Sequence, residues 1–244
     1  MMIVLSVGLP KSGTAWYYNM TNDLLVSVGH QNAREIREKF HLHFTLKHEN
    51  CFWIGSPWRR SLVLIPHFLG STFAIKSHGP PSVMVRLLMR TGVMKLTYVY
   101  RDPRDCVISV FDSGQKRLQS GLPAPGVESI EASIRFIHNW LVPLSEWLED
   151  DNVLKTRYEG LLRDPVCELK RLATFLELAP STEALSRIAS AYQPQHFSDL
   201  SPEKRALHFN KGTVGRFRDR MTLQELDSCQ KYFGDYLQKM GYSA

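Results

Sequence analysis

Short apolar, β-rich runs alternate along the chain with longer segments in which apolar residues recur at helical spacing. The short runs predict buried strands at residues 3–7, 72–75, 96–100 and 153–156. Strands that alternate with helices are typical of a parallel sheet wrapped by helices. We therefore predict an α/β fold, a P-loop-containing three-layer sandwich with a central parallel sheet flanked by helices, formed by residues 1–244 as a single domain.

The helical segments carry start and stop signals. The segment after the first strand is predicted to be a helix that stops at Gly29, with apolar positions at Tyr17, Met20, Leu24, Leu25 and Val28. Plausible first helical positions are Pro81, Pro103 and Pro165, and plausible stops are Gly92 and Gly121.

Three other stretches predict local structure. Residues 129–149 have a helical pattern, but Pro143 within it is expected to kink or split the helix. Thr222 and Glu225 have capping-box spacing before the last apolar stripe. The polar, then aromatic, stretch 31–60 gives the weakest pattern, and we predict a loop over a pocket there.

Composition narrows the class of protein. The 244 residues are 43% hydrophobic and 22% charged, which is ordinary for a folded chain and excludes a disordered or coiled-coil protein. The net charge of +6 favours anionic partners without naming one.

Patterns that would direct the chain out of the cytoplasm are not found in the sequence. The longest stretch free of charged residues, 61–75, is too short to span a bilayer, and the first residues do not resemble a signal peptide. Cysteines 51, 106, 167 and 229 form no C-x-x-C pair and have no histidines at zinc-ligand spacing. We therefore expect free thiols, no membrane span and a cytoplasmic protein.

The strongest chemical signal follows the first strand. Gly8 and Leu9 lead into a loop that combines a glycine-rich turn with a cation and hydroxyls and then enters a helix: Pro10, Lys11, Ser12, Gly13, Thr14, Ala15 and Trp16. Backbone N–H groups and the positive end of a helix dipole converge at such a turn, so it suits a phosphate group. The alternative is an ordinary glycine-rich turn between a strand and a helix.

The loop departs from that of a nucleotide kinase or ATPase. Such a loop places lysine directly after its second glycine, where this chain has Thr14. The strand at 96–100 is followed by Arg101, whereas a kinase-like strand would end in the acid that helps to hold Mg²⁺. Both departures favour an anion site built from cations and hydroxyls, without a metal ion.

Four segments, in the expected order, resemble the sulfotransferase family. The run P-K-S-G-T-A-W looks like that family's 5′-phosphosulfate loop, P-K-S-G-T-T-W, with Ala15 in place of threonine. Residues 98–109 are similar to its 3′-phosphate segment, in which Arg101 and Ser109 match the arginine and serine. Tyr158, in R-Y-E-G-L-L, resembles the Y-E-D-L segment.

The fourth segment resembles the family's R-K-G-x-x-G motif. Lys211 and Gly212 match it, but Asn210 replaces the arginine. Removing the charge-assisted hydrogen bond that an arginine would make there costs about 1.5 to 3 kcal/mol. Basic residues nearby are candidates to replace it at the 3′-phosphate, and they are Arg205, Arg216 and Arg218.

The resemblance implies a donor and a set of roles. The donor would be 3′-phosphoadenosine 5′-phosphosulfate (PAPS), the product adenosine 3′,5′-bisphosphate (PAP), and no metal would be required. Lys11 would stabilise the leaving phosphate, Ser12 and Thr14 would add hydroxyl hydrogen bonds, and Trp16 would stack on adenine or pack in the core.

The resemblance also implies a base for the acceptor. The segment after the strand at 72–75 is similar to the family's K-T-H segment, with Lys76 and His78 in the matching places. In an in-line transfer of the sulfuryl group to a hydroxyl (or amine) of a small-molecule acceptor, His78 would accept the acceptor's proton, and Lys76 would assist at the sulfuryl group.

The acceptor side is predicted less sharply. An aromatic pocket for a phenol, alcohol or lipid-like molecule is one interpretation of a group of residues that core packing explains equally well: Phe52, Trp53, Trp58, Phe68 and Phe73. The stretch Arg218–Asp227, with Thr222 and Leu223, resembles the family's dimer motif and suggests a homodimer.

Two other functions remain open at this point. A P-loop nucleotide kinase would share the fold and bind Mg-ATP. A non-catalytic nucleotide-binding protein or a basic nucleic-acid-binding module would suit the charge, although no basic stripe with interleaved aromatic residues favours nucleic acid. Neither alternative accounts for Lys11, His78, Arg101 and Ser109 together.

Overall fold

A computed structural model describes residues 1–47, 51–52, 61–193 and 212–243 of the chain. Among the predicted site residues, Lys211 lies outside these ranges, as do Asn210, Arg205, Trp53 and Trp58. The strands are β1 (Ile3–Gly8), β2 (Leu46–Lys47), β3 (Cys51–Phe52), β4 (Phe73–Ser77), β5 (Met94–Tyr100) and β6 (Val153–Arg157).

The helices follow the strands in chain order. They are α1 (Thr14–Ser27), α2 (Ala33–Lys39), η1 (Leu42–Phe44), α4 (Leu64–Phe68), α5 (Val83–Arg90), α6 (Pro103–Gln119), α7 (Ile130–Ser145), η2 (Glu146–Glu149), α8 (Tyr158–Arg163), α9 (Pro165–Leu176), α10 (Thr182–Ala191), α12 (Phe217–Arg220) and α13 (Leu223–Lys239).

The sheet confirms the four predicted strands. Its order is β2-β3-β4-β1-β5-β6, and all neighbours pair in parallel except β2, which runs antiparallel to β3 at one edge. The prediction of a central parallel sheet is thus confirmed, and the short antiparallel strand β2 is an addition that the sequence did not predict. Two-residue strands such as β2 and β3 are too short to produce a strand pattern in the sequence.

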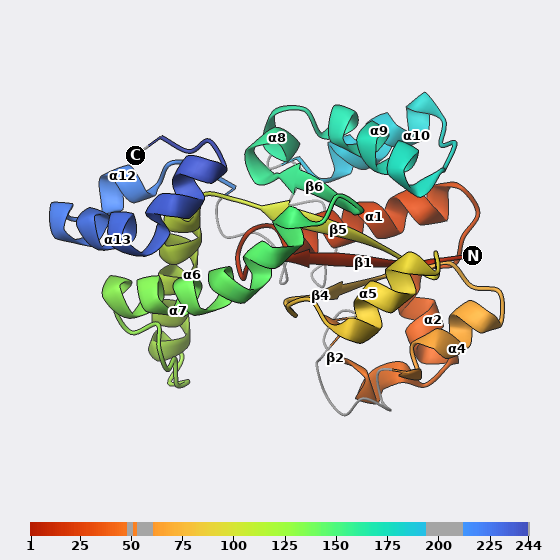
Figure 1. Ribbon diagram of the computed structural model, residues 1–244, viewed down its shortest axis with the longest axis horizontal. Helices are drawn as coiled ribbons and strands as arrows, with labels where there is room; N and C mark the ends of the chain where they lie inside the picture. The colour runs from red at the N-terminus through yellow and green to blue at the C-terminus, as the bar shows by residue number, and fades with distance from the viewer. Residues whose placement is uncertain (48–50, 53–60, 194–211, 244) are drawn as a thin grey trace.

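Helices cover both faces of the sheet, so the predicted three-layer sandwich is confirmed (Figure 1). Helix α1 contacts β1, β4 and β5 and packs against α9 and α10, whereas α5 contacts β5. A further group, α6, α7, α12 and α13, gathers at the end to which the parallel strands point, at the left of Figure 1. This group lies at the carboxyl ends of the parallel strands, where the predicted site residues follow their strands.

Most of the predicted helix signals are confirmed. Gly29, Gly92 and Gly121 each follow a helix in the left-handed conformation, with φ of 90°, 73° and 71°. Pro103 and Pro165 open α6 and α9, and the capping box of α13 forms between Thr222 and Glu225.

One helix prediction needs correction. Pro81 lies before α5, whose N-cap is Ser82, because the Ser82 hydroxyl accepts the Val85 N–H and so starts the helix there.

The predicted helical stretch 129–149 is divided near Pro143. Pro143 occupies the last turn of α7, and the chain continues as the 3₁₀ helix η2.

The stretch 31–60 is not simply a loop. Asn32 caps α2 by accepting the Arg34 N–H, and η1 and the β2–β3 pair follow. A buried anchor holds this segment, because the Asn22 side chain accepts the Ala33 N–H at 2.8 Å. Residues 48–50 and 53–60 lie outside the described ranges.

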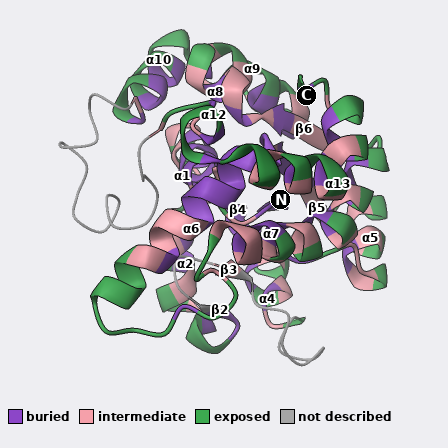
Figure 2. Cartoon of the chain, turned by 90° about the vertical axis from the view of Figure 1, so that its left-hand side faces the viewer, coloured by how far each residue is buried: buried purple, intermediate pink, exposed green. Residues whose placement is uncertain are grey.

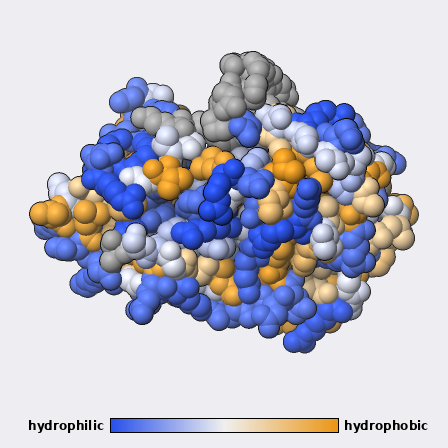
Figure 3. Space-filling view, turned by 90° about the horizontal axis from the view of Figure 1, so that it is seen from above, coloured by the Kyte–Doolittle hydropathy of each residue, from blue (hydrophilic) through white to orange (hydrophobic). Residues whose placement is uncertain are grey.

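The core lies between the sheet and its helices. Every residue of β1 and β4 is buried, and the exposed residues lie on the outer turns of the helices and in the loops, as the purple and green ribbons of Figure 2 show. The face that carries α8, α9 and α10 is largely hydrophilic, with apolar residues in separate groups (Figure 3). Within the described ranges, no helix is both long and apolar enough to cross a membrane.

Candidate functional site

The loop between β1 and α1 has the geometry expected of an anion-binding turn. Ser12 N–H donates to the Leu9 carbonyl at 3.1 Å and closes the turn. Lys11 and Gly13 adopt the left-handed conformation, with φ of 69° and 96°, and α1 then begins at Thr14. The first N–H groups of a helix have no partner within the helix, so this turn presents free donors together with the Lys11 side chain.

The hydroxyls of the loop serve its internal structure. Ser12 is buried and donates its hydroxyl proton to the Leu9 carbonyl at 2.9 Å. It also lies 3.2 Å from the Thr14 hydroxyl. A phosphate oxygen only accepts, so in this arrangement Ser12 shapes the loop rather than donating to a ligand.

Two glycines allow the surrounding groups to approach the loop closely. A Cβ on Gly8 would lie 2.6 Å from the Val99 carbonyl, and one on Gly13 would lie 2.6 Å from the Tyr158 ring. Tyr158 therefore packs directly on the loop, and it also meets Trp16 edge to face at 5.6 Å. Trp16 is 2% exposed, so this structure supports its core-packing interpretation, and adenine stacking stays a prediction.

Arg101, which follows β5, is buried at the centre of the site. Its guanidinium donates to the carbonyls of Lys11 at 3.2 Å and Thr213 at 2.9 Å, and it lies over the Tyr158 ring at 4.1 Å. The buried Asp105 carboxylate is 3.6 Å away. The Nε–H of Arg101 is buried and has no hydrogen-bond partner in the described part of the chain. One donor of a buried cation is thus left for another acceptor.

Residues 212–220, which we call the C-terminal strap, pack against α6. The Asp105 carboxylate accepts the N–H groups of Gly215 at 2.7 Å and Phe217 at 3.4 Å. Ser109, one turn along α6, is also buried. Of the predicted fourth segment, the structure describes Gly212, at the start of the strap, whereas Lys211 lies outside the described ranges.

The two strap arginines proposed as substitutes for the arginine missing at Asn210 have protein partners. Arg216 pairs with Asp112 on α6, and Arg218 lies over the Phe217 ring at 4.8 Å. Arg205 lies outside the described ranges.

His78 stands at the carboxyl end of β4, beside the end of β1. Val7 and Ser77 are paired in register, so the residues after them meet, and His78 Nδ1 lies 2.7 Å from the Gly8 carbonyl. Because a carbonyl only accepts, Nδ1 must carry the proton and Nε2 is left with a free lone pair. The neighbouring Gly79 carbonyl accepts the Trp147 indole N–H at 3.1 Å, which fixes this turn.

Electrostatics keep the His78 ring neutral. Burial lowers the pKa of His78, the Gly8 hydrogen bond raises it, and the charges of Lys76 and Lys11 lower it further. Desolvation by the surrounding protein also lowers the pKa of Lys11, and so does the charge of Lys116. Lys76 is buried, with its Nζ 5.9 Å from the centre of the Tyr18 ring. The three predicted catalytic residues are thus close enough to influence one another.

In the described part of the chain, an aromatic side chain from α7 contacts the predicted base, and the sequence interpretation missed it. Trp140 meets His78 edge to face at 6.4 Å, and Phe136, one turn earlier, lies 6.4 Å from Trp140. Of the residues predicted to line an acceptor pocket, Phe73 is buried in the core and Phe68 is 72% exposed. Helical spacing marks Phe136 and Trp140 only as one apolar face.

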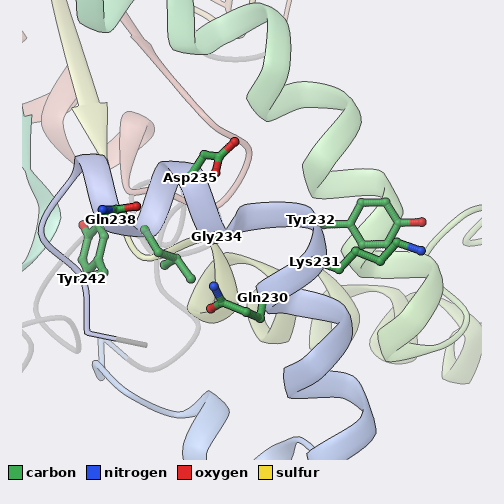
Figure 4. A pocket seen from close by; sticks show the side chains of 8 residues that line it. Gln230, Lys231, Tyr232, Gly234, Asp235, Gln238 and Tyr242 are labelled. Atoms are coloured by element: carbon green, nitrogen blue, oxygen red, sulfur yellow. The ribbon is translucent and has the colours of Figure 1, made fainter.

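Two other kinds of site, a surface hollow and a metal centre, have less support in the described residues. A hollow on α13 is lined by side chains that point in different directions and do not converge (Figure 4): Gln230, Lys231, Tyr232, Asp235, Gln238 and Tyr242. No group of three or more histidine, cysteine or acidic residues that could hold a metal ion occurs within the residues that the structure covers.

Comparison with known proteins decides the family. A family model described as "Sulfotransferase domain" matches residues 3–243. The chain belongs to the sulfotransferase family. Rabbit (Oryctolagus cuniculus) sulfotransferase 1C2 is 22% identical over 88% of this chain and 76% of its own, and Arabidopsis thaliana cytosolic sulfotransferase 7 is 24% identical over 90% and 74%. The solved structure of mouse sulfotransferase SULT7A1 complexed with PAP aligns with a TM-score of 0.62 at 19% identity, over 97% of this chain and 84% of that one.

The enzyme class expected from the four motifs is therefore confirmed as a PAPS-dependent sulfotransferase, whose product is PAP. The kinase alternative has no support in these comparisons.

The electrostatics of His78 generate a prediction about pH. If His78 is the base, its ring must be neutral to accept a proton. Turnover should then fall as the pH drops through a value lower than the ordinary 6.5, and titration of His78 should not affect turnover at neutral pH.

The same hypothesis predicts that His78→Ala reduces turnover by about 10² to 10⁴-fold while leaving the affinity for PAP unchanged. Measured kcat across pH and titration with PAP check both; unchanged turnover in the variant would exclude His78 as the base.

Proposed function

We propose that the protein transfers the sulfuryl group of PAPS to a hydroxyl of an apolar small molecule, with His78 as the base. The observation that carries this proposal is the joint placement of three elements at one edge of the sheet. These are the loop with Lys11, the buried Arg101, whose Nε–H has no partner in the described residues, and a neutral His78, whose Nε2 lone pair can accept a proton.

Lys11 and the first turn of α1 are proposed to hold the 5′ side of the donor. A sulfate ester carries one negative charge less than a phosphate monoester, so a lysine and backbone N–H groups can stabilise the leaving phosphate without a divalent ion. A well-aimed donor of this kind contributes about 2.7 to 4 kcal/mol in the transition state. Lys76, whose charge reaches His78, is proposed to bind the sulfuryl oxygens during transfer.

Arg101 and Ser109 are proposed to hold the 3′-phosphate. The buried, unpartnered Nε–H of Arg101 fits an acceptor such as a phosphate oxygen, because leaving a buried charged donor unsatisfied costs stability. Tyr158, which lies under Arg101 and meets Trp16 edge to face, would position the nucleoside, with Lys211 and Gly212 completing the site.

In the proposed transfer step, His78 acts as the base. Nε2 takes the proton of the acceptor hydroxyl as its oxygen forms a bond to sulfur, and the bond from sulfur to the 5′-phosphate oxygen breaks. The electron pair of that bond leaves with PAP, where Lys11 neutralises it. The Gly8 carbonyl, which holds Nδ1–H, stabilises the imidazolium that forms, and the proton then passes to solvent.

The acceptor is proposed to be a phenol, alcohol or lipid-like molecule, because the aromatic rings of Trp140 and Phe136 lie near His78. We further propose that residues 1–244 act as a single domain in the cytoplasm. All four cysteines are free, which suits a reducing compartment, and a curated relative is a cytosolic sulfotransferase.

Nucleotide titration tests the donor site. We expect PAP to bind without metal, about tenfold or more tightly than AMP, because only PAP carries the 3′-phosphate that Arg101 and Ser109 would contact. Isothermal titration with PAP, AMP and Mg-ATP measures the three affinities. Equal affinities for PAP and AMP, or a preference for Mg-ATP, would contradict the assignment of Arg101 and Ser109.

Substitution of Trp140 tests the proposed contact between α7 and the acceptor. Trp140→Ala should raise the KM for an apolar phenol or alcohol while leaving the KM for PAPS within about twofold, because truncation removes apolar contact area from the acceptor alone. Phe44→Ala, at an aromatic residue that is 77% exposed, is the matched control and should change neither constant. An unchanged acceptor KM in Trp140→Ala would place the acceptor elsewhere.

A homodimer through the stretch Arg218–Asp227 is also proposed, since Leu223 is 82% exposed at the start of α13. Leu223→Asp should shift sedimentation from dimer to monomer without unfolding the chain, because a charge would enter the apolar contact. A wild-type chain that sediments only as a monomer at high concentration would remove this proposal.

A further inference from the structure

The C-terminal strap crosses α6 beside Ser109. The Asp105 carboxylate holds the N–H groups of Gly215 and Phe217, so the backbone of Arg216, the residue between them, is fixed at Asp105. The guanidinium of Arg216, however, pairs with Asp112.

The path of this side chain follows from helix geometry. Asp105 and Asp112 are two turns apart, about 10 Å along the axis of α6. Ser109 lies four residues after Asp105 and three before Asp112, so all three occupy the same face of the helix. A side chain whose backbone is fixed at Asp105 and whose guanidinium pairs with Asp112 therefore spans the turn of α6 that carries Ser109. The Arg216 side chain has 12% of its surface exposed.

The cluster carries an excess of positive charge. Arg220 also pairs with Asp112, at 3.2 Å, so two guanidinium groups share one carboxylate. Although burial alone would raise it, the hydrogen bond and charge of Arg216, aided by Arg220, hold the pKa of Asp112 below its usual range, and the carboxylate stays ionised. Asp112 takes one Nη2 donor of Arg216, and the other donors have no partner within the described ranges.

We propose that Arg216 is a further ligand of the donor's 3′-phosphate, reaching it beside Ser109 and supplying the cation that Asn210 does not. Asp112 is then a positioning residue that holds the guanidinium of Arg216 against α6, and Arg220 is a second partner of the same carboxylate that does not contact the phosphate. This inference rests on the proposed function, because it takes Ser109 and Arg101 to mark the 3′-phosphate.

The test compares the two arginines that share Asp112. Arg216→Gln should lower the affinity for PAP by about tenfold or more and leave that for AMP within about twofold, since the variant cannot form the charge-assisted hydrogen bond to the 3′-phosphate. Arg220→Gln, which removes the other partner of the same carboxylate, should leave both affinities within about threefold. Both are measured by isothermal titration of the full chain, and thermal unfolding of the two variants shows whether they remain equally folded.

Each outcome separates this inference from the proposed function. An unchanged ratio of PAP to AMP affinity in Arg216→Gln would overturn it, and so would an equal drop in Arg220→Gln, because that result means that the strap is loosened and no ligand is removed. Arg101→Gln is the reference variant. If it loses the discrimination between PAP and AMP while Arg216→Gln keeps it, the proposed donor site stands and Arg216 is excluded; if Arg101→Gln keeps the discrimination, the donor site itself is wrong.

Discussion

The buried guanidinium of Arg101 holds together segments that lie far apart in the sequence. It donates to the carbonyl of Lys11 in the first loop and to that of Thr213 in the C-terminal strap, and it covers the ring of Tyr158, which closes on Gly13. Burying a cation is costly unless its donors are satisfied, so these contacts and Asp105 must be in place before the site exists. The Nε–H of Arg101 has no such partner within the described residues, so it is the donor left to bind a ligand.

The sheet determines which residues can reach this point. Parallel strands end at the same edge, and the register of β1 with β4 and β5 brings the first loop, His78 and Arg101 to it. His78 illustrates how little is then needed to set chemistry: one bond to the Gly8 carbonyl fixes the tautomer, and burial beside two lysines keeps the ring neutral. Sulfuryl transfer requires cations that stabilise the leaving group and a neutral base that accepts the proton of the acceptor.

Sequence patterns predicted the central strands, most helix ends and the residues of the first loop, because each depends on neighbours along the chain. The short strand β2 carries too few residues for a period, so its antiparallel pairing was missed. Phe73 and Trp140 are both aromatic, and only the packing of α7 against the turn after β4 separates a core residue from one beside His78. The roles of Asp105 and Asp112 depend on contacts more than 100 residues away, which no local pattern contains.

The proposed binding of the donor's 3′-phosphate by the buried Arg101 can be seen in a crystal structure of the full chain with PAP. We expect a 3′-phosphate oxygen within hydrogen-bond distance of Arg101 Nε and the Ser109 hydroxyl, with the 5′-phosphate at the first turn of α1. A nucleotide whose 3′-phosphate points away from Arg101, or one bound with the phosphates exchanged, would contradict it.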